Sequence, residues 1–146
     1  LLSRGLGDVY KRQVFKRYRK VSVREYQTKN IGCGAQMQSG EESLQILEYL
    51  FLHFQKPFQM KEMETEMKKK ESLIERRARE TFGRSIQELL EEIRIRIACS
   101  YLSATDRTVT QISSDVGFGS ISSFQRSFSK YMNQTPSEYR RFHQCK

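Results

Sequence analysis

Two arginines, Arg76 and Arg126, stand at the same place in two similar segments of this chain of 146 residues. Gln125 directly precedes the second arginine, and Ser122 lies one helical turn before it. A guanidinium holds its N–H donors in a planar fork, and a glutamine amide both donates and accepts, so these side chains suit recognition through hydrogen bonds. The sequence shows no nucleophile, acid–base pair or phosphate-binding glycine loop. We therefore expect a binding protein rather than an enzyme, without catalytic residues.

The second segment, residues 108–142, predicts two short helices joined by a turn. Thr108 and Gln111 form a capping box, and Gly117 stands where a helix end needs positive φ. Ser120 is a good N-cap for the next helix. Its apolar residues recur at helical spacing and are predicted to point inward: Ile121, Phe124, Phe128 and Tyr131. The outward face is left to the hydrogen-bonding side chains.

A weaker copy of this pattern lies 50 residues earlier in the chain. A shift of 50 pairs Ile74 with Phe124, Arg76 with Arg126, Ala78 with Phe128, Gly83 with Asn133, Ser85 with Thr135 and Glu88 with Glu138. The paired residues also share roles, because glycine and asparagine both end helices in the left-handed conformation and the last two pairs both form capping boxes. A doubled helix-turn-helix pattern indicates a reader of double-stranded DNA.

The remaining pattern is also helical, which makes the predicted fold class all-α. A capping box of Ser39 and Glu42 predicts a helix that Pro57 stops. Methionines at helical spacing predict a short helix over residues 60–67, with the methionines as core. We expect a third helix over about 71–82 and a long one over about 86–103 that joins the two copies.

The net charge of +9 is unevenly distributed. Residues 1–40 hold 9 Lys or Arg against 2 Asp or Glu, which leaves 17 against 15 for residues 41–146. Placement rather than bulk charge therefore points to a polyanionic partner. Cations cluster around one predicted turn and helix: Lys68, Lys69, Lys70, Arg76, Arg77 and Arg79.

We predict two regions, an irregular basic segment over residues 1–40 and a double helix-turn-helix domain over residues 41–146. Residues 1–13 resemble translated adaptor sequence and are left out of functional reasoning. Residues 14–40 are interpreted as a linker, with a remnant of a missing domain or a basic arm on phosphate as alternatives. The cysteines lack metal-ligand spacing, so we expect neither a metal nor a cofactor. No membrane-spanning or secretory segment is visible, and a cytoplasmic location is expected.

Residues 43–142 resemble the DNA-binding domain of AraC/XylS-type transcriptional regulators. The matching residues are Arg94-Ile95, Ala98, Leu102, Ile112, Val116-Gly117-Phe118, Ser122 to Phe124, Arg126, Phe128 and Thr135 to Arg140. The Arg76-Arg77 pair and the ending at residues 135–142 are most similar to the branch whose amino-terminal partner is a glutamine-amidotransferase-like domain.

The resemblance implies a seven-helix domain with two helix-turn-helix units joined by a long linker helix. Each unit would place its second helix in the major groove of DNA. By position, the residues that would face base edges are Ser72, Glu75, Arg76, Ile121, Ser122, Gln125 and Arg126. Those better placed for phosphate contacts are Lys68, Lys69, Lys70, Arg79 and Lys130.

Three residues of the first unit depart from the family pattern. Glu64 occupies a site where the family has a small alanine, Ala78 replaces a large aromatic, and Lys70 replaces the usual serine cap. We expect an unpaired buried carboxylate at Glu64 and a gap beside Ala78, both of which would weaken the first unit. Base reading is therefore expected to rest mainly on the second helix of the second unit, residues 121–131.

The predicted function is a sequence-specific, double-stranded DNA-binding transcription regulator of the bacterial nucleoid. RNA polymerase is a further expected partner, and we expect the effector-binding domain to lie outside this chain. The alternative is a helical interaction module with a degenerate first helix-turn-helix. It would keep the fold without reading DNA and would bind RNA polymerase or a sibling subunit.

Overall fold

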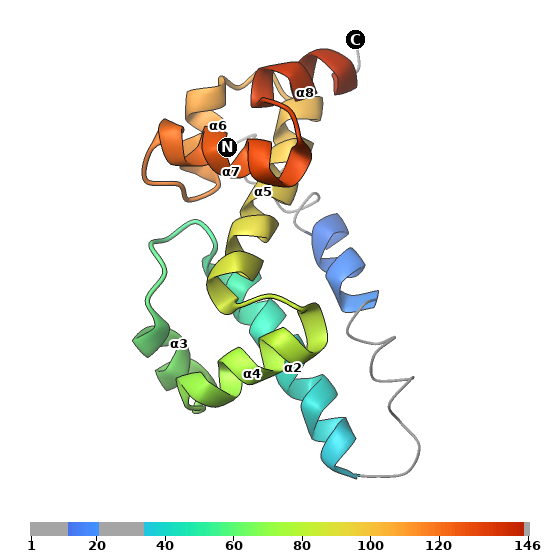
Figure 1. Cartoon of the computed structure of the whole chain (residues 1–146), viewed down its shortest axis with the longest axis vertical. Coiled ribbons are helices and arrows are strands. Elements are labelled where there is room, and N and C mark those ends of the chain that lie inside the picture. The colour runs from blue at the N-terminus through green and yellow to red at the C-terminus, as the bar shows by residue number, and fades with distance from the viewer. Residues whose placement is uncertain (1–11, 21–33, 145–146) are drawn as a thin grey trace. The chain divides into compact units, whose positions relative to one another are not determined.

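The structure, a computed structural model, describes residues 12–20 and 34–144, with the side chains of residues 34–39 left out. Every regular element in these ranges is a helix (Figure 1). After a helix at residues 12–20 come α2 (Gly34–His53), α3 (Met60–Met67), α4 (Glu71–Phe82), α5 (Ile86–Ala104), α6 (Val109–Asp115), α7 (Ile121–Met132) and α8 (Pro136–His143). The all-α, seven-helix prediction is confirmed by α2 to α8. None of the described helices is long and apolar enough to cross a lipid bilayer.

The described residues fall into two compact units. The amino-terminal unit comprises residues 12–20, 34–53 and 58–90, and the carboxy-terminal unit comprises residues 54–57 and 91–144. Each unit contains one helix-turn-helix pair, α3–α4 in the first and α6–α7 in the second. Helix α5 runs from one unit into the other, as the sequence predicts.

The second helices of the two pairs have matching bounds. Helix α4 covers residues 71–82 and α7 covers 121–132, so the shift of 50 seen in the sequence holds at both ends. Gly83 and Asn133 end them in the left-handed conformation, with φ of 66° and 55°. Both backbone N–H groups close the preceding helix, Gly83 onto Arg79 and Asn133 onto Ser129. The predicted repeat is therefore a structural repeat.

Packing in the amino-terminal unit centres on α2 and α4, which lie across each other in Figure 1. Fully or almost fully buried side chains come from four of its helices: Ile46, Leu47, Leu50, Met63, Ile74, Ala78, Ile86 and Leu89. Because their burial removes apolar surface from water, these residues supply most of the stability of the unit.

The interpretation of residues 1–40 as irregular was wrong for residues 12–20, which form a helix, and for residues 34–40, which belong to α2. Val14 is buried there, and the ring of Phe15 meets Phe51 of α2 edge-on at 5.3 Å between centroids. Tyr18 lies 6.3 Å from Phe51 and 6.4 Å from Phe82 of α4. Three apolar residues spaced over one helical turn are too short a pattern to show as a period, so the sequence reading missed this helix.

The predicted capping box of Ser39 and Glu42 was also wrong. Helix α2 begins at Gly34, five residues before Ser39, so neither residue lies at its start. Glu42 is instead a buried carboxylate, 7% exposed, and accepts a hydrogen bond of 2.6 Å from Nε of Arg77. A tertiary ion pair uses the side chain that the local pattern assigned to a cap.

Candidate nucleic-acid interface

Helix α7 presents a polar face that the protein does not use internally. Ser122, Gln125 and Arg126 lie at helical spacing along this face, and all three are exposed. Within the described part of the chain, their side chains have no hydrogen bond or ion pair. Ile121, the first residue of the helix, is half-buried beside them. The donors and acceptors of this face are therefore available to an outside partner.

The opposite face of α7 fixes how the helix sits. Phe124 and Phe128 have no exposed surface, and Phe128 packs edge-on against Tyr139 of α8 at 5.6 Å. The buried hydroxyl of Ser127 also donates a hydrogen bond to the carboxylate of Glu91 on α5. Because apolar packing and this hydrogen bond act on the same side, they set the rotation of α7 about its axis. The outward direction of Gln125 and Arg126 follows from that rotation.

The start of α7 is capped as predicted. The hydroxyl of Ser120 accepts a hydrogen bond of 3.2 Å from the backbone N–H of Ser123. No acidic residue lies in the first turn of α7, so the positive end of its helix dipole carries no neighbouring side-chain anion from that turn. Such an end favours a phosphate.

Gly117, in the turn between α6 and α7, has φ of +93°, as its predicted place required. A Cβ atom built there would lie 2.3 Å from the backbone oxygen of Phe54 and 3.1 Å from Nε of Arg94. Arg94 of α5 donates to the backbone oxygens of Phe54 and Lys56, both at 2.8 Å, and its guanidinium lies 5.9 Å from the centre of the Phe118 ring. Burial lowers the pKa of Arg94. This arginine binds residues 54–57 close to the turn.

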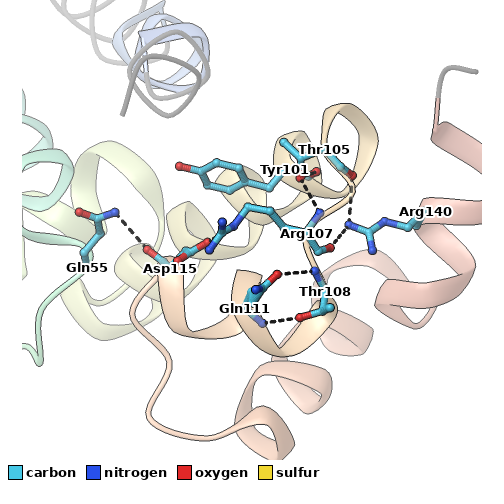
Figure 2. A network of polar contacts seen from close by, with 8 residues as sticks. All are labelled: Gln55, Tyr101, Thr105, Arg107, Thr108, Gln111, Asp115 and Arg140. Carbon is cyan, nitrogen blue, oxygen red and sulfur yellow. Dashed lines mark hydrogen bonds and ion pairs between the residues drawn. The ribbon is translucent and has the colours of Figure 1, made fainter. Parts of the chain in front are cut away.

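In the same unit, a polar network connects the residues between α5 and α6 with Asp115 of α6 and Arg140 of α8 (Figure 2). Arg107, which lies between α5 and α6, donates to the carboxylate of Asp115 at 2.6 Å, and the amide of Gln55 donates to the Asp115 backbone oxygen at 3.1 Å. The guanidinium of Arg140 on α8 donates to the backbone oxygens of Thr105 and Arg107, as Figure 2 shows. These bonds supply partners for carbonyl groups just beyond the carboxyl end of α5 and hold α6 in place.

In the amino-terminal unit, α4 has a comparable outward face. Ser72, Arg76 and Arg79 are exposed there, as are Lys68 and Lys70 in the turn before the helix. Among the described residues, none of these five side chains has a hydrogen bond or ion pair. The inward face carries the buried Ile74 and Ala78, so the alternation predicted from the sequence is present.

Other side chains expected at this interface have partners inside the protein. Lys69 lies 3.5 Å from the Glu42 carboxylate, and the carboxylate of Glu75 accepts a hydrogen bond of 3.2 Å from the backbone N–H of Ile86. In the carboxy-terminal unit, Lys130 remains largely exposed but lies 4.0 Å from Glu91. The sequence reading could not distinguish these engaged groups from free ones.

The unpaired carboxylate expected at Glu64 and the gap expected beside Ala78 are not present. Glu64 is only half-buried and it has a partner. Its carboxylate accepts a hydrogen bond of 2.6 Å from the backbone N–H of Glu71. Ala78 has no exposed surface, so no gap that water could enter lies beside it. The hydrogen bond from Arg77 to Glu42 also raises the pKa of Arg77, which keeps this arginine charged in its half-buried site.

The sequence profile of a helix-turn-helix domain matches residues 64–141, which is more than half of the chain. The chain belongs to the AraC-type helix-turn-helix family. The matched residues include both helix-turn-helix pairs except for the first residues of α3.

Curated relatives of this AraC-type domain are bacterial regulators. An uncharacterized HTH-type transcriptional regulator of Staphylococcus aureus (strain MSSA476) is 34% identical over 96 residues, which are 66% of this chain and 13% of that protein. The ornithine utilization regulator of Pseudomonas aeruginosa is 35% identical over 65 residues, 44% of this chain and 19% of that protein. The chain therefore spans only a small part of the length of these relatives.

Solved structures share the AraC-type fold. A transcriptional regulator with an AraC-type DNA-binding domain from Chromobacterium violaceum superimposes with a TM-score of 0.68 at 20% identity, over 73% of this chain and 96% of that one. The DNA-binding domain of the global transcriptional factor AdpA, in complex with a target DNA, gives a TM-score of 0.62 at 20% identity, over 66% and 87% of the two chains.

The sequence predicted the exposed faces of α4 and α7 of this AraC-type domain but not the contacts that hold α6 and α7. Glu91, Arg94, Arg107 and Arg140 bond groups other than their sequence neighbours, and only Arg94 and Arg140 stood out beforehand, as residues of the family resemblance. The assignment to the branch with a glutamine-amidotransferase-like domain stays a prediction.

Proposed function

We propose that this chain is the sequence-specific DNA-binding part of a transcription regulator, which reads double-stranded DNA with α4 and α7. The observation that carries the proposal is the unengaged face of α7, where Ser122, Gln125 and Arg126 are exposed on a helix whose other face is fixed in the core. A helix of this kind fits the major groove, with its first turns on the base edges.

The chemistry of this face suggests which bases it reads. The fork of Arg126 can donate two hydrogen bonds to guanine O6 and N7, and the amide of Gln125 can pair with adenine N6 and N7. Ile121 offers a methyl-rich contact for thymine, and Ser122 can bond to several bases. One well-formed bidentate pair discriminates against a wrong base by about 1–3 kcal/mol.

In the first unit, Arg76 and Ser72 take the corresponding role on α4. Lys68, Lys70 and Arg79 are free for contacts to phosphate, which position the protein without reading sequence. We leave Glu75 out of the proposed base contacts, because its carboxylate already has a partner. Lys69 is expected to contribute less than its neighbours for the same reason.

We propose that α7 dominates base reading. Its exposed face offers a guanidinium and an amide, both able to pair bidentately, whereas the exposed face of α4 offers the guanidinium of Arg76 for bases and that of Arg79 for phosphate. The first turn of α4 also carries Glu71, with the Glu64 carboxylate bonded beside it, and these charges repel phosphate. The first turn of α7 carries no acidic residue.

Regulation would follow from docking near a promoter, where the protein recruits or blocks RNA polymerase.

The full chain should be incubated with a pool of randomised duplexes, and the bound fraction sequenced over several rounds. We expect an enriched asymmetric motif whose most constrained positions include a guanine. An unenriched pool would contradict sequence-specific reading and favour the helical interaction module.

The same selection separates one reading helix from two. Two constrained blocks whose centres lie about one helical turn, 10–10.5 base pairs, apart would indicate that α4 and α7 both read bases. A single block would indicate that only one unit reads, and loss of that block in Arg126→Ala but not in Arg76→Ala would identify α7.

A further inference from the structure

The start of α4, like that of α3, lacks the side-chain cap that α6, α7 and α8 have. Lys70 occupies the N-cap position in extended conformation, and its side chain makes no capping hydrogen bond. By contrast, Thr108, Ser120 and Thr135 cap α6, α7 and α8 with their hydroxyl groups. A helix start without a cap leaves backbone N–H groups unsatisfied and is less stable.

We infer that Glu64 of α3 provides this missing cap, and that Glu64 and Glu75 are the positioning residues of α4. This inference rests on the proposed function only in calling α4 a reading helix. Oε1 of Glu64 accepts the hydrogen bond from Glu71 N–H at 2.6 Å, the distance of a strong charge-assisted bond. The carboxylate also lies at the positive end of the α4 dipole, where a negative charge is stabilising.

Glu64 also organises the turn between α3 and α4 through its backbone. Its carbonyl oxygen accepts a hydrogen bond from the N–H of Lys68, which ends α3 with φ of 55°, and another of 3.2 Å from the N–H of Lys69. The side chain then bonds Glu71 at the first position of α4. One residue therefore binds both sides of the turn that sets the angle between the two helices.

Glu75 fixes α4 at a second point. Its carboxylate accepts from Ile86 N–H at the start of α5, where Ser85 and Glu88 complete a capping box with each other. Helix α4 is thus bonded to α3 through Glu64 and to α5 through Glu75, in addition to its buried apolar face. These two bonds restrict sliding and rotation of the face that carries Ser72 and Arg76.

The departures at positions 64 and 70 therefore compensate each other. The carboxylate of Glu64 satisfies the first N–H of the helix and places a negative charge at its start, and position 70 holds an exposed lysine in place of a capping side chain. A lysine at the start of a reading helix is well placed to neutralise a phosphate. Glu64 thus stabilises the start of the helix, and Lys70 supplies a cation that a serine at this position would not supply.

Amide hydrogen exchange by NMR on the full chain tests the cap directly. Glu64→Ala should speed exchange of the Glu71 amide about fivefold, the change expected when one capping bond is lost. Glu62→Ala, which removes the same charge from an exposed site on α3, should leave that amide unchanged. Lys70→Ser in the Glu64→Ala background should stabilise the start of α4 again. The rescue should appear as slower exchange of the Leu73 amide, because an N-cap hydroxyl accepts from the second or third N–H of a helix and not from the first. Unchanged exchange in Glu64→Ala, or no rescue by Lys70→Ser, would overturn the inference.

Binding to a selected duplex tests positioning as distinct from folding. Glu64→Ala should lower discrimination at base pairs assigned to Arg76 and leave discrimination at those assigned to Arg126 unchanged. The double variant with Lys70→Ser should recover discrimination, but its affinity should depend less steeply on salt, by about 0.9 in the slope of log K against log salt concentration. Equal losses in both half-sites would contradict a positioning role.

Glu75→Ala should speed exchange of the Ile86 amide without changing which base is preferred at any single position. A changed preference confined to one base pair would contradict the positioning role and return Glu75 to the base-reading set. Failure of the proposed function remains distinguishable, because a protein that selects no duplex motif would still show the exchange effects of Glu64→Ala and Glu75→Ala.

Discussion

Arginines in this protein divide into those that bind its own groups and those that remain free. Arg77, Arg94, Arg107 and Arg140 each donate to a carboxylate or to backbone carbonyls. Arg126, by contrast, has no partner among the described residues. An unpaired guanidinium suits a bidentate contact with a base, because its planar fork is pre-organised and less freedom is lost for each hydrogen bond formed.

At the residue scale, Cys99 should be inert as a thiol in the folded protein. Burial raises its pKa to about 11 from the ordinary value of 9.0. In a variant with Cys33 and Cys145 replaced by serine, Cys99 should therefore react with an aromatic disulfide reagent at pH 8 only after unfolding. Reaction in the native protein at the rate of the unfolded chain would contradict this.

The same thiol should reduce stability in alkaline solution. The folded state favours the protonated thiol. The stability that Cys99 contributes to the folded state is therefore fully present below pH 9, and it is lost as pH rises from about 9 to 11. The loss is of the order of 3 kcal/mol in the free energy of unfolding. Urea unfolding across this range should show a smaller loss in Cys99→Ala, and an equal loss would contradict it. Burial also raises the pKa of Tyr49 and Tyr139, which adds a loss of the same sign in both proteins.

At the element scale, the turn between α6 and α7 requires a glycine at position 117 but not at position 119. Gly117→Ala should lower the free energy of unfolding by roughly 2 kcal/mol or more, because a Cβ there meets positive φ and the Phe54 carbonyl. Gly119→Ala is the matched control, since a Cβ at Gly119 meets nothing within 4 Å. Similar losses in urea unfolding of the two variants would show that the close approach at Gly117 does not matter.

The helix at residues 12–20 should stabilise the amino-terminal unit through its aromatic side chains. Phe15→Ala removes the edge-on contact with Phe51 and should cost about 1–2 kcal/mol. Amide exchange in the middle of α2 should rise accordingly, whereas Lys16→Ala, at an exposed position of the same helix, should have no effect. Equal exchange in both variants would return this segment to the predicted role of a linker.

Local signals made most helices predictable. Capping boxes at Thr108, Ser85 and Thr135 and left-handed ends at Gly83 and Asn133 involve residues within one helical turn, so the sequence contains both partners side by side. Ser39 and Glu42 show the limit of that reasoning. They have the right types and spacing, but Arg77, distant in the sequence, takes the carboxylate.

The candidate site was predictable in its outward residues and not in its supports. Helical spacing placed Gln125 and Arg126 outward because Phe124 and Phe128 had to be buried. Whether Glu75 or Glu64 finds a partner depends on how α3, α4 and α5 meet, which no pattern in the sequence contains. Both carboxylates were expected elsewhere, one on a base and one unpaired.

At the scale of the whole molecule, net charge is a poor guide to where DNA would dock, because residues 41–146 carry 17 cations against 15 anions. Free cations at defined positions should matter instead. Arg79→Ala should flatten the slope of log K against log salt concentration by about 0.9, the effect of one phosphate contact. Lys61→Ala, an exposed cation on α3, should leave the slope unchanged. Equal changes would indicate attraction by overall charge rather than by a defined docking face.

The preference of the full chain for its selected duplex over a scrambled duplex tests the central claim most directly. For Arg126→Ala, we predict that this ratio of affinities falls by about 5- to 150-fold, as expected for loss of one bidentate base contact. The affinity for the scrambled duplex should change little, and Arg141→Ala, another exposed arginine of the same unit, should keep the full ratio. An unchanged ratio in Arg126→Ala would contradict the account that the exposed face of α7 reads DNA sequence.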